Sequence, residues 1–160
     1  MAKVIVLQGK DNVGKSSTLR ELLNTLNMQP QLFTLVAAED NNLLHRLSNK
    51  GDVWAIFKNI KTNKIIGITT RGDSAGCIVA DFNTMKKQVQ CKVKDKLDCD
   101  IYVCAAHLYG KTIDCIVSRF GYQNVYFYGR IEINDSVYNF DIIRKNLNIR
   151  DANMLYKNLI

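Results

Sequence analysis

The residues whose types and spacing suggest chemistry lie close to Met1. Gly9, Gly14, Lys15 and Ser16 occupy the four fixed positions of the pattern G-x-x-x-x-G-K-[ST]. The two glycines permit a turn in which consecutive backbone N–H groups point inward, and a helix is expected to begin directly after it. Such a loop binds clustered phosphate oxygens, because its amides, the helix dipole and the lysine all present positive charge to them. The pattern therefore predicts a triphosphate-binding loop over residues 9–17.

Each polar side chain of this loop has an expected role. Lys15 is predicted to reach the β- and γ-phosphates and to act in catalysis, and the Ser16 hydroxyl is predicted to ligate Mg²⁺. Ser17 is predicted to add a contact to the α-phosphate. The full set of expected nucleotide contacts is Gly9, Asp11, Asn12, Val13, Gly14, Lys15, Ser16 and Ser17. The implied ligands are a purine nucleoside triphosphate and Mg²⁺.

The segments on either side of the loop predict the strand and the helix that hold it. Residues 4–7 are all apolar, which is typical of a central strand covered on both faces. After the loop, leucines recur at helical spacing, at Leu19, Leu22, Leu23 and Leu26. Pro30 lies just past the expected end of that helix. The order is strand, glycine loop, helix.

The rest of the chain alternates between strand-like and helix-like segments. Further strands are predicted over residues 32–38, 53–60, 65–69, 101–106 and 125–133. The second and third of these are joined by four polar residues and should form a hairpin. Helices are predicted over residues 43–48, 78–93, 112–120 and 141–159, the last with a break near Asn148. The fold class is therefore α/β, with a mostly parallel sheet, an added antiparallel hairpin and helices on both faces.

With its flanking elements, the loop resembles the Walker A signature of the P-loop NTPase superfamily. The specific match covers roughly the first 27 residues. The form Gly-x-Asp-x-x-Gly-Lys-Ser, with Asp11 at its third position, is similar to that of thymidylate-type kinases. This resemblance implies a three-layer fold and transfer of the γ-phosphate of ATP to a small-molecule or nucleotide acceptor. The arginine-rich lid of such kinases is not evident in the sequence.

The resemblance also implies an acidic residue that holds Mg²⁺ at the end of a neighbouring strand. The strand predicted before His107 carries no carboxylate. Asp73 is the favoured candidate, because it follows a predicted strand and a glycine at the edge where open α/β sheets bind ligands. The alternatives are the neighbours Glu39 and Asp40. A purely structural role for Asp73, as the cap of a helix starting near Ser74, is equally compatible with the sequence.

Phosphoryl transfer further calls for a cation beside the transferred group. Arg71 is the catalytic candidate, and Arg119, Arg130 and Lys111 are alternatives. For each of them the competing interpretation is a solvated charge or the partner of a carboxylate. Residues 107–112 are a candidate second phosphate-facing loop.

The letters Asn49-Lys50-Gly51-Asp52 match the guanine-recognition signature N-K-x-D. That signature should follow an apolar strand, whereas residues 43–48 have the spacing of a short helix. The match is therefore discounted, and ATP is favoured over GTP.

Bulk composition narrows the class of protein. The 160 residues suit one nucleotide-binding domain over residues 1–160, and no apolar stretch approaches the roughly 20 residues of a membrane span. The apolar run near Met1 is too short for the apolar region of a secretory signal. The five cysteines form no Cys-x-x-Cys pair, and we expect them to be reduced thiols of a cytoplasmic protein. The net charge of +7 suits polyanionic ligands, but a triphosphate site uses part of it, so nucleic-acid binding does not follow.

Two alternatives to a small kinase stay open. One is an ATPase or nucleotide-binding switch that acts through a protein or nucleic-acid partner, with the lysines between Lys86 and Lys96 as a docking face. The other is a nucleotide-binding module with negligible hydrolysis.

Overall fold

The computed structural model describes residues 2–10, 14–40, 42–72, 74–130 and 139–160. Its strands are β1 (Lys3–Gln8), β2 (Phe33–Ala38), β3 (Trp54–Asn59), β4 (Ile65–Thr69), β5 (Ile101–Ala106) and β6 (Val125–Gly129). Its helices are α1 (Lys15–Asn27), α2 (Leu43–Ser48), α3 (Ala75–Lys92), α4 (Lys111–Phe120), the short 3-10 helix η1 (Tyr122–Asn124) and α5 (Phe140–Lys157). Over the residues that the structure describes, no helix combines the length and the apolar character needed to cross a membrane.

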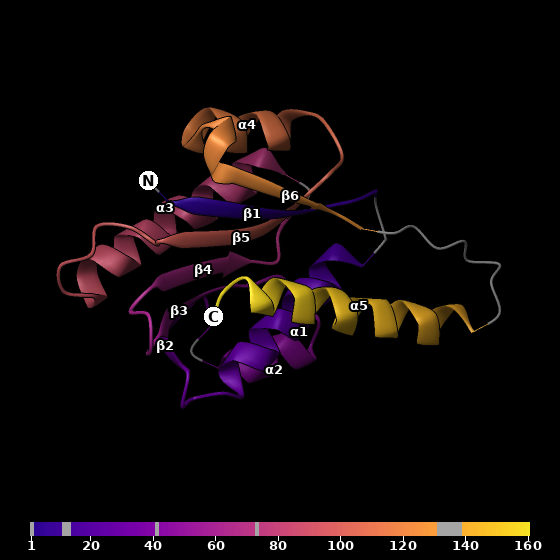
Figure 1. Ribbon diagram of the computed structural model, residues 1–160, viewed down its shortest axis with the longest axis horizontal. Coiled ribbons are helices and arrows are strands. Elements are labelled where there is room, and N and C mark those ends of the chain that lie inside the picture. Colours follow the sequence, from indigo (N-terminus) through magenta and orange to yellow (C-terminus); the bar gives the residue numbers. More distant parts are fainter. Residues whose placement is uncertain (1, 11–13, 41, 73, 131–138) are drawn as a thin grey trace.

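The strands form one six-stranded sheet in the order β2-β3-β4-β5-β1-β6 (Figure 1). β1 pairs in parallel with both β5 and β6, and β4 pairs in parallel with β5. β3 is antiparallel to β2 and to β4. The predicted α/β class with a mostly parallel sheet is therefore confirmed, and so is the hairpin. The hairpin is not an addition beside the parallel strands, however, because β2 and β4 run in the common direction and β3 is inserted between them.

Helices cover both faces of the sheet, and the alternation of side chains along the strands explains the two cores. In β1, Ile5 packs with leucines of α1 and with Leu155 of α5 on one face, while Val4 and Val6 pack with residues of α3 and α4 on the other. Residues 4–7 have no exposed surface, as expected for a central strand. Figure 1 shows α4 above the sheet and α1, α2 and α5 below it.

Three differences between the predicted elements and the structure bear on the candidate site or on its supposed partner surface. α5 continues through Asn148 without a break, because the Asn148 side chain faces α1 and the end of β6, where tertiary contacts outweigh its weak helix propensity. β6 ends at Gly129, and positions 131–133 of the predicted strand lie outside the described residues. α3 ends at Lys92, so the supposed basic helix face does not extend to Lys96.

Candidate phosphate-binding site

The loop predicted to bind phosphate starts where three parallel strands end at the same level. Gln8 of β1 is in register with Ala106 of β5 and with Gly129 of β6. The ladder continues one step past the strands, since the Gly9 amide donates to the Ala106 carbonyl (3.3 Å) and the Arg130 amide donates to the Gln8 carbonyl (2.8 Å). The first residue of the loop is therefore fixed from both sides at the carboxyl edge of the sheet, where open α/β sheets bind ligands.

Gly14 forms the N-cap of α1 in the left-handed region, with φ 89° and ψ 24°. Its carbonyl accepts the first helical hydrogen bond from the Thr18 amide (2.9 Å), while it offers no side chain to cap the other amides of the first turn. A Cβ at this position would lie 2.7 Å from Asn148 Oδ1. The left-handed backbone geometry thus favours glycine, and a larger residue would also displace the Asn148 side chain; the helix start presents its amides to the loop. Asp11, Asn12 and Val13 lie outside the described residues.

The Lys15 side chain is folded back into the loop that precedes it. Its Nζ donates to the carbonyl oxygens of Gly9 (2.7 Å) and Lys10 (2.6 Å), and the residue is only 6% exposed. The ammonium therefore lies against the backbone of the loop that is predicted to bind phosphate.

Ser16 connects α1 to the residue after β4. Its Oγ donates to the carbonyl oxygen of Thr70 (3.0 Å), and the Thr70 hydroxyl donates to Asp52 Oδ1 (3.1 Å). Arg20, one helical turn after Ser16, places Nη1 3.9 Å from the same carboxylate. Asp52 is thus an acidic residue on the serine side of the loop. In the sequence, Asp52 stands out only as the last residue of the N-K-x-D match, and no local pattern links it to Ser16, 36 residues earlier.

The segment after β4 crosses the end of β5 toward the loop. A Cβ at Gly72 would lie 2.6 Å from the Ala105 Cβ, so only glycine permits this close approach. Asp73, the favoured metal ligand, follows this glycine but lies outside the described residues. The helix-capping role considered for it is filled by Ser74, which is the N-cap of α3 and accepts from the Cys77 amide (3.4 Å).

Arg71, the catalytic candidate, is held by two carboxylates. Its guanidinium donates to Glu39 (2.7 Å) and to Asp81 (3.0 Å), and the Thr69 hydroxyl also donates to Asp81. Hydrogen bonds with Glu39 and Asp81 hold the pKa of Arg71 above its ordinary value, against the opposing effect of burial. This network fixes the segment that carries Thr70 and Gly72, and it also engages Glu39, one of the alternative metal-binding acids.

Arg130 is the candidate cation that contacts the loop directly. Its side chain is 1% exposed and donates to the Gly14 carbonyl (3.2 Å), to the Thr18 hydroxyl and to Asn148 Oδ1. Asp151 lies 3.6 Å from its Nη1, and its buried Nε finds no hydrogen-bond partner among the described residues. Burial lowers the pKa of Arg130, while Asp151 opposes that effect. Arg130 therefore joins β6, α1 and α5 at the start of the helix.

The other candidate cations lie at different places. Lys111 is the first residue of α4, at the edge of the sheet that carries the loop. Arg119 lies in the last turn of the same helix, donates to Asn83 of α3 (2.8 Å) and lines a surface hollow with the residues that precede β5. It is therefore at the opposite edge of the sheet.

The predicted second loop, residues 107–112, does lie beside the first. The side chain of Gln8, the last residue of β1, donates to the Leu108 carbonyl (3.3 Å), and Gly110 is the N-cap of α4 with φ 102°. Leu108 and Tyr109 are exposed, the latter by 83%.

The N-K-x-D letters at residues 49–52 follow the helix α2 and not a strand. A guanine-recognition signature should follow an apolar strand, so the structure agrees with the decision to discount this match.

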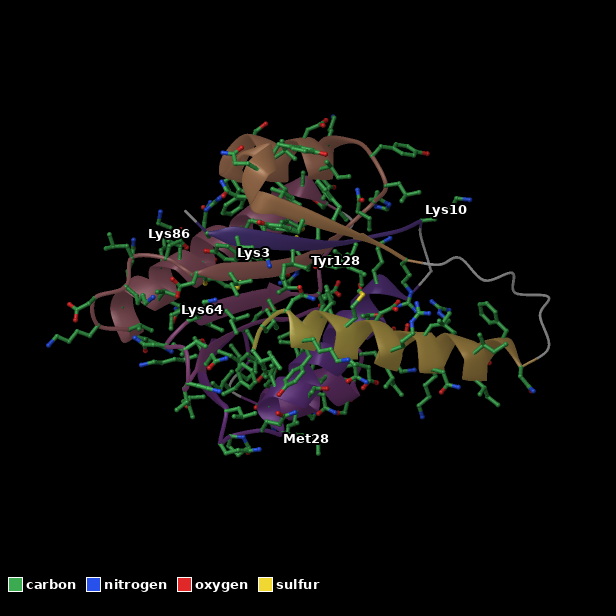
Figure 2. All side chains as sticks on the ribbon, viewed as in Figure 1. Lys3, Lys10, Met28, Lys64, Lys86 and Tyr128 are labelled. Carbon is green, nitrogen blue, oxygen red and sulfur yellow. The ribbon has the colours of Figure 1, made fainter. Side chains whose placement is uncertain are left out.

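The supposed docking lysines are distant from the loop. Figure 2 shows Lys10, at the end of β1, and Lys86, on α3, at opposite ends of the sheet in this view. Lys86 approaches Asp98 (3.7 Å) and Lys96 pairs with Asp100 (2.8 Å). Part of the basic character of this region is thus balanced by neighbouring carboxylates.

Two residues of α5 also belong to the candidate site, although no local sequence pattern places them there. Asn148 and Arg144 both contact the loop region around Gly14, although they are more than 120 residues away in the chain.

The described residues contain no cluster of three or more histidine, cysteine or carboxylate side chains suited to a metal ion. Comparison of the chain with protein-family models, with curated proteins and with solved structures found no match.

Proposed function

We propose that this chain binds the phosphates of ATP, together with Mg²⁺, through residues 9–17 and transfers the γ-phosphate to a small-molecule or nucleotide acceptor. The proposed fold is the three-layer P-loop NTPase fold. Its support is a mostly parallel sheet between two helical layers, with the glycine loop leading from β1 into α1 at the carboxyl edge.

The observation that carries the proposal is the position of Lys15. Its ammonium is almost fully buried and donates to two carbonyl oxygens of the loop that it follows. A lysine stem has four rotatable bonds, so a small rotation transfers the ammonium from these carbonyls to phosphate oxygens in the same loop. Gly14 and the open first turn of α1 supply backbone donors beside it.

The chain's own residues divide the remaining work. Ser16 and Asp73 are proposed to hold Mg²⁺, which when bound neutralises charge on the β- and γ-phosphates. Lys15 stabilises the charge on the transferred group, and Arg71 is proposed to assist once it leaves Glu39, the more exposed of its two carboxylate partners. ATP is preferred over GTP because residues 49–52 lack the strand that the guanine signature requires.

A cytoplasmic location is part of the proposal. All five cysteines lie in the described part of the chain and carry free thiols. Reduced thiols are the rule in the cytoplasm.

The first experiment measures binding. Titration of the protein with a fluorescent ATP analogue and Mg²⁺ should saturate, and Lys15→Ala should lower the affinity at least about 10-fold, since a hydrogen bond to a charged group contributes about 1.5–3 kcal/mol. Lys87→Ala, an exposed lysine on α3, is the matched control and should bind as the original chain does. Equal affinity of the Lys15 and Lys87 variants would refute the assigned role.

The second experiment separates the possible reactions. ATP turnover is measured with Mg²⁺ alone and then with nucleosides, nucleotides, sugars, nucleic acids and proteins. Stoichiometric phosphorylation of a small acceptor supports the kinase, while acceleration by nucleic acid or protein alone supports the partner-driven ATPase or switch. Tight binding without turnover leaves a nucleotide-binding module.

A further inference from the structure

The inner face of α5 changes from apolar to polar along its length. Ala152, Leu155 and Leu159, in and just after the second half of the helix, are buried in the core beside α1. The same face continues toward the start of the helix with Asn148 and Arg144, at intervals of four residues. Figure 1 shows that this first part of α5 extends beyond the start of α1 and past the edge of the sheet. The polar part of the face is therefore the part that overhangs the phosphate loop.

Two guanidinium groups converge on Gly14. A Cβ at this glycine would lie 3.4 Å from Arg130 Nη2 and 3.4 Å from Arg144 Nε. Arg144 is half-buried and lies over the ring of Phe140, one turn earlier, with 5.8 Å from Cζ to the ring centroid. Packing against Phe140 limits the freedom of the Arg144 side chain and keeps it directed at the start of α1.

Among the described side chains around this glycine, positive charge exceeds negative charge. Asp151 is the carboxylate that faces Arg130 (3.6 Å), and it is shared with Arg150 (2.8 Å). After the larger effect of burial, repulsion from Arg144 and Arg150 also lowers the pKa of Arg130. A group of like charges that is drawn together in this way becomes more favourable when an anion joins it.

Arg144 presents its guanidinium to the start of α1 beside that of Arg130, which donates to the Gly14 carbonyl and to Asn148. We propose that α5 forms a second wall of the phosphate site and that Arg144 binds phosphate oxygens of the nucleoside triphosphate. A guanidinium presents a planar pair of donors that matches phosphate geometry. This inference rests on the proposed nucleotide binding and adds a residue and an element to it.

The test compares Arg144→Ala with Lys145→Ala, which removes one positive charge from the exposed side of the same helix. Both variants are titrated with ATP and with inorganic tripolyphosphate, each with Mg²⁺. We expect Arg144→Ala to weaken both ligands by a similar factor, on the order of 10- to 100-fold, as for a lost charge-assisted hydrogen bond. Lys145→Ala should stay within about 2-fold, since an exposed charge acts only through screened, longer-range electrostatics.

Two further measurements distinguish phosphate binding from a structural role. Arg144→Lys should recover part of the affinity, and the dependence of affinity on salt concentration should be shallower in Arg144→Ala than in Lys145→Ala, because one fewer cation meets the ligand. If Arg144→Ala is too unstable to titrate, Arg144→Gln replaces it. Unchanged affinity for tripolyphosphate in a folded Arg144 variant overturns the inference and leaves the proposed function in place. No binding of either ligand to the original chain overturns both.

Discussion

Ser16 Oγ donates a hydrogen bond of 3.0 Å to the carbonyl oxygen of Thr70, and this bond joins the first turn of α1 to the segment that follows β4. A hydroxyl has one proton to donate and two lone pairs to offer. With its proton directed at Thr70, the serine oxygen keeps its lone pairs available to a cation. The bond therefore orients Ser16 for the metal-binding role proposed for it.

Ser16→Ala should weaken ATP binding in the presence of Mg²⁺ and have little effect when the metal is removed with EDTA. The reason is that the alanine lacks the oxygen that would meet the ion. Ser16→Thr should restore the Mg²⁺ effect, since it keeps the hydroxyl. Ser17→Ala provides the contrast, because loss of an α-phosphate contact should weaken binding equally with and without the metal. Isothermal titration in the two buffers measures all of these, and a metal-independent loss in Ser16→Ala would contradict the assignment.

Gly14→Ala should destabilise the protein and abolish tight ATP binding. A left-handed conformation costs a non-glycine residue about 1–2 kcal/mol, and the new methyl group would also displace Asn148, whose Oδ1 lies 2.7 Å from the Cβ position. The control is Gly76→Ala in the first turn of α3, where the nearest atom is 3.7 Å away. That substitution should leave stability unchanged or raise it by up to about 1 kcal/mol. Urea unfolding with and without ATP measures both, and similar midpoints for the two variants would count against the geometry of the loop.

Asp73→Asn should lower Mg²⁺-dependent turnover more than it lowers nucleotide affinity, because an amide is a poorer ligand for a hard cation than a carboxylate. Asp52→Asn is the matched comparison, since Asp52 is connected to Ser16 through Thr70. If Asp73 is the metal ligand, the Asp52 variant should keep most of its turnover. Turnover assays at several Mg²⁺ concentrations separate the two carboxylates, and a larger loss in Asp52→Asn would transfer the role to that residue.

The buried thiols should be unreactive and should make stability sensitive to alkaline pH. Burial raises the pKa of Cys99 and of Cys104 from 9.0 to about 12. An acid that holds its proton more tightly when folded stabilises the folded state below the pKa of the unfolded thiol, and this contribution is lost as the pH rises toward the folded pKa. Thiol reagents should therefore modify the exposed Cys77 and Cys91 in the native protein and reach the buried pair only after unfolding. Between pH 9.0 and about pH 12, the free energy of unfolding of Cys104→Ala should fall less than that of the original chain. Rapid labelling of Cys104 in the native protein would contradict the prediction.

The parts of the site with a local signature were predictable from the sequence. The run Val4 to Leu7, the glycine spacing and the leucines of α1 depend on neighbours a few residues apart, and the structure contains the predicted strand and helix. The contacts of Arg130 and Asn148 with Gly14 had no such signature, because they join residues more than 110 positions apart. The predicted break at Asn148 was wrong for the same reason: helix propensity is a local quantity, and the partners of this side chain are distant.

The predicted sheet was incomplete for a related reason. Hairpin spacing identified β3 and β4 as antiparallel neighbours, and this is confirmed. Strand order in the sheet depends on which face each connecting helix covers. The spacing of residues within the hairpin therefore could not predict that β4 pairs in parallel with β5. The same topology sets Arg71 apart from the loop strand, since β5 lies between β4 and β1.

The central place of β1 imposes an order on how the protein can be made. Its two partners in the sheet, β5 and β6, lie about 100 residues or more downstream. A ribosome adds about 5–20 residues per second, so the four apolar residues of β1 emerge on the order of ten seconds before the last strand that pairs with them. During translation this segment is an unpaired hydrophobic strand, which is the kind of segment that chaperones shield from aggregation. The glycine loop after β1 can therefore acquire its shape only late in synthesis, when the two strands that flank β1 have arrived.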